Sequence, residues 1–259
     1  MEVSGDFAVE ERDLGAWWVT ISRPQKHNAL SRGVLDQLGQ VVAECGRMDR
    51  SRLIVLTGAG DRYFAAGGDL VDLSSIRDEA ATLDMTDQAR RALDAVRDCP
   101  VPVIALVNGD AIGGGAELAL SCDMRMQSER ARIGFIQAKL AITSAWGGGP
   151  DLCRLVGAAR AMRMMGRCEL IDAPTALQWG LSDAVIGAET REDDIAAFLG
   201  PMLKCPAQVL RGIKAQTRAY RQGLSYDQRR SIEQRELVKT WLHEDHWVAA
   251  DALLTKGKK

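Results

Sequence analysis

Two glycine-rich turns constrain the fold of this chain more than any other sequence feature. The first turn is Phe64-Ala-Ala-Gly-Gly-Asp-Leu70, and the second is Asn108-Gly-Asp-Ala-Ile-Gly-Gly-Gly-Ala-Glu117. Each follows a strand-like apolar run, residues 53–56 or 101–107, and leads into a predicted helix. Glycine at a helix start exposes backbone N–H groups, which stabilise negative charge. The two turns therefore predict an oxyanion hole built from the main chain.

Glycine turns of this kind have other uses. A plain strand-to-helix turn needs the same residues. Phosphate-binding loops are disfavoured because neither G-x-G-x-x-G nor G-x-x-x-x-G-K-[ST] occurs, and no lysine follows residues 113–115. The serine-hydrolase pattern Gly-x-Ser-x-Gly is absent as well. His27, His243 and His246 show no metal-binding spacing with acids or cysteines, so we expect no metal site.

The order of apolar patterns predicts an α/β core. Residues 16–22 read as a strand, and apolar positions from 34 to 45 mark one face of a helix. A strand at 53–57, a helix near 84–98 and a strand at 102–107 follow. Alternation of this kind is typical of α/β proteins. From about residue 190 onward the sequence predicts helices only.

Five segments in this order resemble the crotonase, or enoyl-CoA hydratase/isomerase, superfamily. They are Ile21-Ser-Arg-Pro-Gln-Lys-His-Asn-Ala-Leu30, the two glycine turns, Gly147-Gly148 with Arg154-Leu-Val-Gly157, and Ala173 to Leu181. The resemblance implies a spiral of ββα units that binds an acyl-CoA thioester. It assigns the oxyanion donors to Gly68 and Gly114, and it implies no cofactor besides the CoA of the substrate.

The resemblance also implies a division of the chain. Residues 1–190 would form the crotonase-like spiral with the acyl-CoA site, and residues 191–259 a helical oligomerisation region. Apolar positions in this tail cannot all be covered by the tail itself. We therefore expect a homotrimer or a dimer of trimers.

Glu117 and Gln137 occupy the positions of the two catalytic glutamates of enoyl-CoA hydratases. Glu117 stands three residues after Gly114, so its side chain can reach the oxyanion site, where burial would raise its pKa. It alternatively complements the helix dipole. At the second position Gln137 brings an amide, which cannot take a proton from water. Hydration by two carboxylates, and isomerisation by a carboxylate at this second position, both lose support.

The remaining predicted ligand contacts follow from the resemblance. We expect the substrate and its CoA to be bound by Lys26, His27, Ala29, Ala66, Asp69, Leu70, Trp146 and Lys256. Each lysine is alternatively a solvated surface charge, and Trp146 alternatively belongs to the core.

The segment Gly134-Phe-Ile-Gln-Ala-Lys-Leu-Ala-Ile-Thr-Ser-Ala-Trp146, with Thr255-Lys-Gly-Lys258, looks like the ethylmalonyl-CoA decarboxylase branch. The first hypothesis is therefore an enzyme that decarboxylates a malonyl-type CoA thioester through an enolate. The alternatives are a hydratase or isomerase with a single glutamate, and a non-catalytic subunit that binds acyl-CoA.

The composition of the chain further limits the kinds of partner and the compartment that we expect. With 33 basic and 35 acidic residues the net charge is −2, which offers no general attraction to nucleic acid or to acidic membranes. The six cysteines form no C-x-x-C pair, which favours free thiols in a reducing compartment. No export signal or membrane-length apolar segment is seen, so we expect a cytoplasmic protein.

Overall fold

The strands of this computed structural model, which describes residues 5–256, form two sheets. The larger sheet has the order β1-β2-β3-β5-β7-β10 and the smaller has the order β4-β6-β8-β9. Neighbouring strands are parallel except in two pairs: β1 is antiparallel to β2, and β9 is antiparallel to β8. The strands are β1 (Phe7–Arg12), β2 (Ala16–Ile21), β3 (Leu53–Gly58), β4 (Tyr63–Ala65), β5 (Val103–Val107), β6 (Asp110–Ile112), β7 (Met124–Ser128), β8 (Arg132–Gly134), β9 (Leu170–Asp172) and β10 (Ala184–Ile186).

The helices complete a spiral. They are α1 (Arg32–Arg47), α2 (Leu70–Leu73), α3 (Glu79–Arg97), α4 (Gly114–Ser121), α5 (Gly148–Val156), α6 (Ala158–Arg167), α7 (Ala173–Trp179), α8 (Arg191–Leu203), α9 (Ala207–Arg221), α10 (Tyr226–Trp241), α11 (Glu244–Lys256) and the short 3₁₀ turns η1 (Asp13–Gly15), η2 (Pro24–Lys26) and η3 (Gln137–Leu140). The pairs β3-β4, β5-β6 and β7-β8 each place one strand in each sheet before a helix follows. The predicted α/β class and ββα spiral are confirmed.

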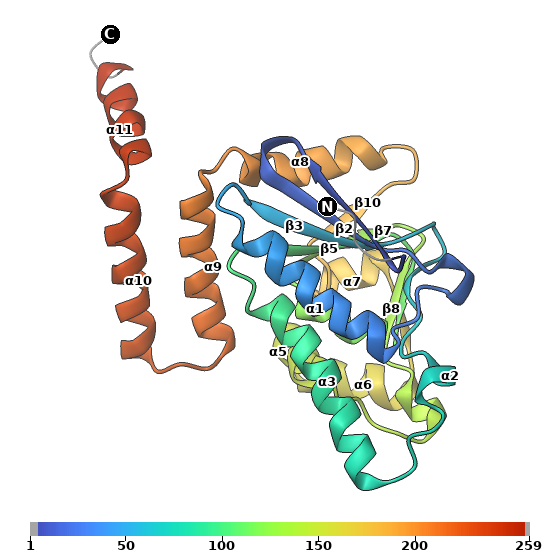
Figure 1. The fold of residues 1–259 in the computed structure, drawn as a ribbon. Helices are drawn as coiled ribbons and strands as arrows, with labels where there is room; N and C mark the ends of the chain where they lie inside the picture. The colour runs from blue at the N-terminus through green and yellow to red at the C-terminus, as the bar shows by residue number, and fades with distance from the viewer. Residues whose placement is uncertain (1–4, 257–259) are drawn as a thin grey trace.

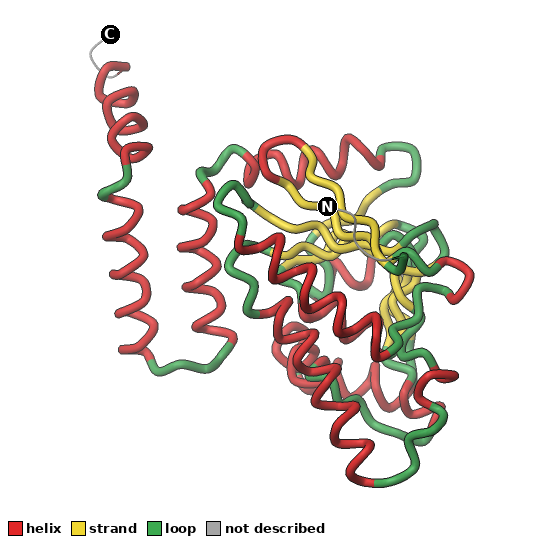
Figure 2. Tube along the Cα trace, viewed as in Figure 1, coloured by secondary structure: helices red, strands yellow, loops and turns green. Residues whose placement is uncertain are grey.

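Helices cover both faces of the larger sheet. Successive side chains of its strands point in opposite directions, so each strand contributes to a core on either face. Trp17 and Val19 of β2 join the core that contains α1 and α3. Trp18, the residue between them, lies in a second core with Ile195 and Leu199 of α8. Figure 1 shows α8 on one side of this sheet and α1 and α3 on the other, and Figure 2 shows the strands enclosed between these helices.

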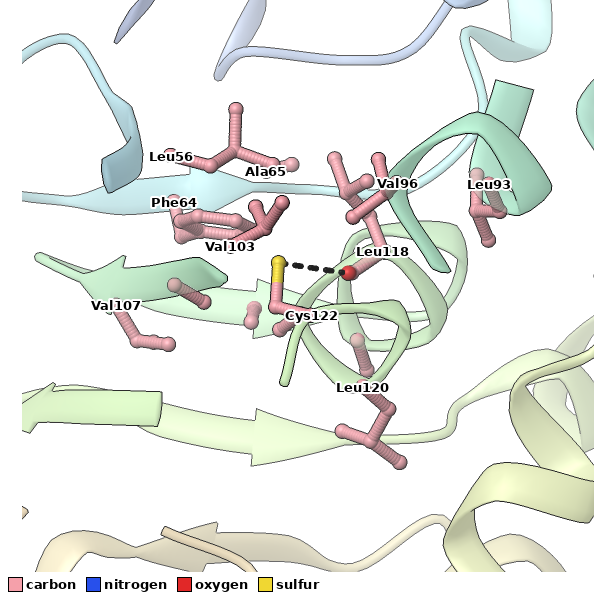
Figure 3. Close-up of a cluster of buried hydrophobic side chains, with 14 of the residues drawn as sticks. Leu56, Phe64, Ala65, Leu93, Val96, Val103, Val107, Leu118, Leu120 and Cys122 are labelled. Atoms are coloured by element: carbon pink, nitrogen blue, oxygen red, sulfur yellow. Dashed lines mark hydrogen bonds between the residues drawn. The ribbon is translucent and has the colours of Figure 1, made fainter. Parts of the chain in front are cut away.

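Helix α4 is buried along its whole length, which explains its apolar sequence. Figure 3 shows Leu118, Leu120 and Cys122 of this segment among side chains from the neighbouring strands and from α3. The Cys122 thiol lies 3.7 Å from the Leu118 carbonyl oxygen. Glu117 is the one acidic residue in the first turn of α4, so its charge has to be met by nearby donors.

The helices α10 and α11 extend away from the sheets, and α9 joins them to the core. Lys214 of α9 is buried and lies 2.6 Å from both carboxylate oxygens of Asp123, which follows α4. Helix α10 packs on α9, and α11 continues beyond it, away from the rest of the molecule (Figure 1). Large apolar side chains on α10 and α11 are exposed, namely Leu237, Val238, Trp241, Leu242, Trp247, Val248, Leu253 and Leu254. Within residues 5–256, no helix combines the length and apolarity that crossing a membrane requires.

Candidate functional site

The two glycine turns meet at one edge of the smaller sheet. They follow β4 and β6, which are neighbouring parallel strands, so the two turns emerge side by side. Gly67 and Gly113 adopt φ values of 107° and 57°, which favour glycine. A Cβ atom on Gly67 would lie 3.5 Å from the Gly114 nitrogen, so the two turns are in close contact.

The backbone N–H groups of Gly68 and Gly114 have no hydrogen-bond acceptor in the described part of the chain. Their neighbours are occupied: the Asp69 N–H donates to the Leu30 carbonyl, and the Gly113 N–H donates to the Gly134 carbonyl. The turns therefore offer two donors beside each other, as an oxyanion hole requires.

The indole of Trp146 lies against both turns. A side chain on Gly114 would overlap this ring, and a Cβ atom on Gly68 would contact it at 3.5 Å. Trp146 is 7% exposed, so most of its surface belongs to the core. The ring therefore leaves no room for a side chain at position 114, and it packs against the residues that carry the two N–H groups.

Glu117 is 2% exposed and its carboxylate accepts three hydrogen bonds. The N–H groups of Trp146 and Gly148 donate to Oε2 at 3.0 and 2.9 Å, and the Gln137 side-chain amide donates to Oε1 at 3.0 Å. Burial raises the pKa of Glu117, and the three donors, together with the charge of Arg97, offset part of this effect. A buried carboxyl whose pKa is raised is suited to exchanging a proton with a bound substrate.

Gln137 begins η3, and its side chain lies beside Glu117. Its Nε2 faces the carboxylate, while its Oε1 is buried and has no hydrogen-bond partner among the described residues. The oxygen and nitrogen of such an amide are assigned by the hydrogen bonds they make, and a half-turn of the amide exchanges them. The side chain can therefore donate to an ionised Glu117 or accept from a protonated one.

The loop that carries Lys26, His27 and Ala29 is joined to the first glycine turn. The Ala66 N–H donates to the His27 carbonyl, and the Leu30 N–H donates to the Gly67 carbonyl. His27 also stacks on Tyr63 with ring centroids 4.7 Å apart. A hollow of about 250 Å³ lies beside this loop and is lined in part by His27, Arg62 and Tyr63.

The other predicted contact residues differ in their surroundings. Asp69 is buried, caps α2 and pairs with Arg23 at 3.3 Å and with Lys26 at 3.8 Å, so its carboxylate is already engaged by the protein. Leu70 is 62% exposed on α2. Lys256 ends α11, and its side chain lies outside the described part of the chain.

The sequence did not predict the arginines behind the site. Arg90 and Arg97 of α3 donate to the carbonyls of Ala145 and Trp146 at 2.8 and 3.3 Å. Their spacing of seven residues, two helical turns, places them on one face of α3. This spacing is visible in the sequence, but nothing there shows that the loop at 145–148 packs against it.

The ββα spiral, with two adjacent glycine turns beside a buried glutamate, is the arrangement of the crotonase fold. The family model for enoyl-CoA hydratase/isomerase matches residues 11–258. The chain belongs to the enoyl-CoA hydratase/isomerase family.

Known relatives differ in their named activities. The chain is similar to a short-chain-enoyl-CoA hydratase of Clostridium acetobutylicum, with 36% identity over 174 residues, which span 65% of this chain and 64% of that relative. It is 30% identical to a crotonyl-CoA hydratase of Syntrophomonas wolfei over 240 residues, 92% of this chain and 91% of the other. An ethylmalonyl-CoA decarboxylase of Rattus norvegicus is 28% identical over 213 residues, 81% of this chain and 71% of the other.

A solved structure has the same fold over nearly the whole chain. The enoyl-CoA hydratase of Bacillus anthracis superposes with a TM-score of 0.89 at 26% identity and covers 97% of this chain and 96% of its own. Both kinds of relative, hydratase and decarboxylase, are therefore similar to this protein.

Proposed function

We propose that this protein decarboxylates a malonyl-type CoA thioester, such as methylmalonyl-, ethylmalonyl- or malonyl-CoA. The observation that carries the proposal is the pairing of one carboxylate, Glu117, with the amide of Gln137. Hydration by two carboxylates needs a second acid at this place, whereas decarboxylation needs only a stabilised enolate and one proton donor. No cofactor besides the CoA of the substrate takes part in this reaction.

In the proposed reaction the bond between the α-carbon and the carboxylate breaks, and CO₂ leaves. The electron pair of that bond enters the thioester to form an enolate, whose oxygen is bound by the N–H groups of Gly68 and Gly114. Glu117 in its protonated form then gives its proton to the α-carbon and regains one from water. Its raised pKa supports this role, because the acid form persists to higher pH.

The amide of Gln137 is compatible with a site in which Glu117 is the one proton donor, because it carries no charge. A second carboxylate at 3.0 Å from Glu117 would repel the ionised form of Glu117, whereas the amide donates to that form. After a half-turn, the buried Oε1 of Gln137 accepts from protonated Glu117, so the amide suits both states of the proposed cycle.

Trp146 is proposed to exclude water from the reacting groups. Its ring is buried against Gly68 and Gly114, and a dry site strengthens the hydrogen bonds to an enolate oxygen. Lys26, His27, Ala29, Ala66 and Leu70 are proposed to contact the CoA or the acyl group from the joined loops, and Lys256 to contact CoA phosphate.

The second candidate is an enoyl-CoA hydratase or isomerase in which Glu117 alone handles the proton. The names of the relatives that are hydratases favour it. A non-catalytic subunit that binds acyl-CoA is the third candidate.

The test is incubation of the purified protein with methylmalonyl-, ethylmalonyl-, malonyl- and crotonyl-CoA, followed by mass spectrometry. Loss of the mass of CO₂ from a malonyl-type thioester supports decarboxylation. Gain of the mass of water on crotonyl-CoA favours the hydratase. The variant Glu117→Gln distinguishes the two reactions, since it should abolish hydration and only slow decarboxylation. Binding of CoA without any turnover would leave the third candidate.

We also propose that the protein is a homotrimer or a dimer of trimers in the cytoplasm. The exposed apolar side chains of α10 and α11 support assembly, because they have no cover within the described chain. Light scattering coupled to size exclusion tests this point. A stable monomer at micromolar concentration would contradict it.

A further inference from the structure

The turn formed by residues 145–148 supplies two of the three donors to Glu117. The Trp146 N–H and the Gly148 N–H both donate to Oε2 of Glu117. These N–H groups belong to the peptide bonds Ala145–Trp146 and Gly147–Gly148, so their directions depend on how those peptide planes are held. A peptide plane is rigid, and in the trans form its C=O and N–H point in opposite directions.

Arg90 holds the first of these planes from the opposite side. Its Nε donates to the Ala145 carbonyl oxygen at 2.8 Å, while the N–H of the same peptide donates to Glu117 at 3.0 Å. The result is a continuous chain from a guanidinium through one peptide group to a carboxylate. Hydrogen bonds in such a chain polarise and strengthen one another, and this one has an ionic group at each end.

Arg97 holds the peptide Trp146–Gly147, which lies between the two peptides whose N–H groups bind Glu117. Its guanidinium donates to the Trp146 carbonyl at 3.3 Å and lies against Gly147, where a side chain would collide with it. The same guanidinium pairs with Asp151 of α5 at 3.0 Å and with Asp94 at 2.8 Å, and Arg221 of α9 pairs with Asp151 at 2.7 Å. Arg97 is therefore fixed between two helices while it binds the turn.

We infer that Arg90 and Arg97 are positioning residues for Glu117, acting through the peptide groups of residues 145–148. Neither arginine side chain hydrogen-bonds the carboxylate itself; each binds a carbonyl of the turn whose N–H groups do. The inference rests on the proposed function only in taking Glu117 as the group that carries the proton. It predicts that weakening either arginine contact weakens the donors and so destabilises the ionised form of Glu117.

The test is a direct titration of Glu117 in the free protein by infrared difference spectroscopy. The carboxyl band that is lost in Glu117→Gln identifies the group. Arg90→Gln removes the contact with Ala145 at an exposed position, where folding is not at risk. Arg97→Lys keeps the charge but cannot span Trp146 and Asp151 as the guanidinium does. Both should raise the pKa of Glu117, because each leaves the N–H groups that donate to its carboxylate less firmly held.

Arg91→Gln is the matched control. It removes the same charge from the next residue of α3, but Arg91 faces the groove toward α1 that Asp36 and Glu44 also line. The charged groups around the turn, namely Arg97, Asp151, Arg154 and Arg221, stay unchanged in Arg90→Gln and in the control. If Arg90→Gln and Arg97→Lys titrate like Arg91→Gln, the inference is wrong. The titration needs no substrate, so its outcome is independent of whether a malonyl-type thioester is decarboxylated.

Discussion

Gly114 meets two separate requirements at one position. Its N–H, at the start of α4, donates to no acceptor in the described chain, and its Cα has no room for a side chain because Trp146 lies against it. The first requirement concerns charge and the second concerns packing. Two substitutions at this position therefore separate them.

Gly114→Pro should lose roughly a hundredfold more of kcat/KM than Gly114→Ala, because only proline removes the N–H donor. Proline is tolerated at the first position of a helix, so the difference between the two variants should reflect the lost donor rather than a broken helix. Both add a clash with Trp146, so alanine controls for that cost. Steady-state kinetics on the thioester that the protein turns over provide the comparison. Equal losses in the two variants would contradict the role of this amide.

The raised pKa of Glu117 makes stability depend on pH. The folded state binds this proton more tightly than the unfolded state, so the stabilisation is complete below the unfolded pKa of about 4.3 and is lost as pH rises through the folded pKa. Relative to Glu117→Gln, the free energy of unfolding of the wild-type protein should fall as pH rises above that value. Urea unfolding of both proteins over a pH series measures the difference. A difference that grows in favour of the wild type would show that the three donors outweigh burial.

Part of the site follows from local sequence and part does not. The positions of Gly68, Gly114 and Glu117 follow from turns and a helix start that are adjacent in the chain to their strands. The contacts of Arg90 and Arg97 with residues 145 and 146 join segments about fifty residues apart, and only the folded structure brings those together.

Among the elements, α9 is joined to the core by buried charges. Lys214 is 3% exposed and pairs with Asp123, while Arg221 donates to the carbonyls of Leu120 and Ser121 at the end of α4 and pairs with Asp151. The helix that carries Glu117 is therefore bound at its C-terminal end by α9. Positive charge at that end is also favoured by the helix dipole.

Lys214→Met should lower the free energy of unfolding by about 3 kcal/mol, because it removes the cation that pairs with the Asp123 carboxylate and leaves it only the Val103 N–H as a donor among the described residues. The double variant Lys214→Met with Asp123→Asn should recover part of this loss. Lys239→Met is the control: this lysine also pairs with a carboxylate, that of Glu236, but its side chain is 61% exposed, so its loss should cost less than about 1 kcal/mol. Urea unfolding compares the three. A similarly small loss of stability in both lysine variants would contradict a stabilising role for the buried Lys214–Asp123 ion pair.

The longer elements could be predicted from periodicity, as could the short strand β8, but two other three-residue strands could not. The strand expected at 16–22 is β2, that at 53–57 is β3 and that at 102–107 is β5. The strands β4 and β6 have three residues each, too few to show alternation, and they were not predicted. Tertiary pairing between parallel neighbours defines them instead.

Over the whole molecule, helices in the C-terminal region were predictable but their position was not. α8 belongs to the core of the larger sheet, whereas α10 and α11 contact little of the remainder. The sequence shows apolar positions in α8 and also in α10 and α11, but it does not show which part of the molecule covers those positions. The proposed boundary at residue 190 thus remains a prediction.

The cysteines report on the packing of the whole molecule. Cys45, Cys99 and Cys122 are buried, and burial raises the pKa of these thiols to about 11, about 11 and about 12. At pH near 8, the folded protein should therefore react with a thiol reagent at no more than Cys153, Cys168 and Cys205. Counting reacted thiols by mass spectrometry, before and after unfolding in urea, tests this. Rapid modification of any of the buried three in the folded protein would show that its core opens.

Trp146 has a consequence for the evolution and redesign of this enzyme. One residue donates its N–H group to Glu117 and rests its ring on both glycine turns. If the proposed function holds, a change of its side chain made to admit a different acyl group would also disturb the packing around the Gly68 and Gly114 N–H groups and the turn that binds Glu117. New specificity is therefore expected to arise first at positions that do not share these duties, such as the exposed Leu70 and Val71 of α2.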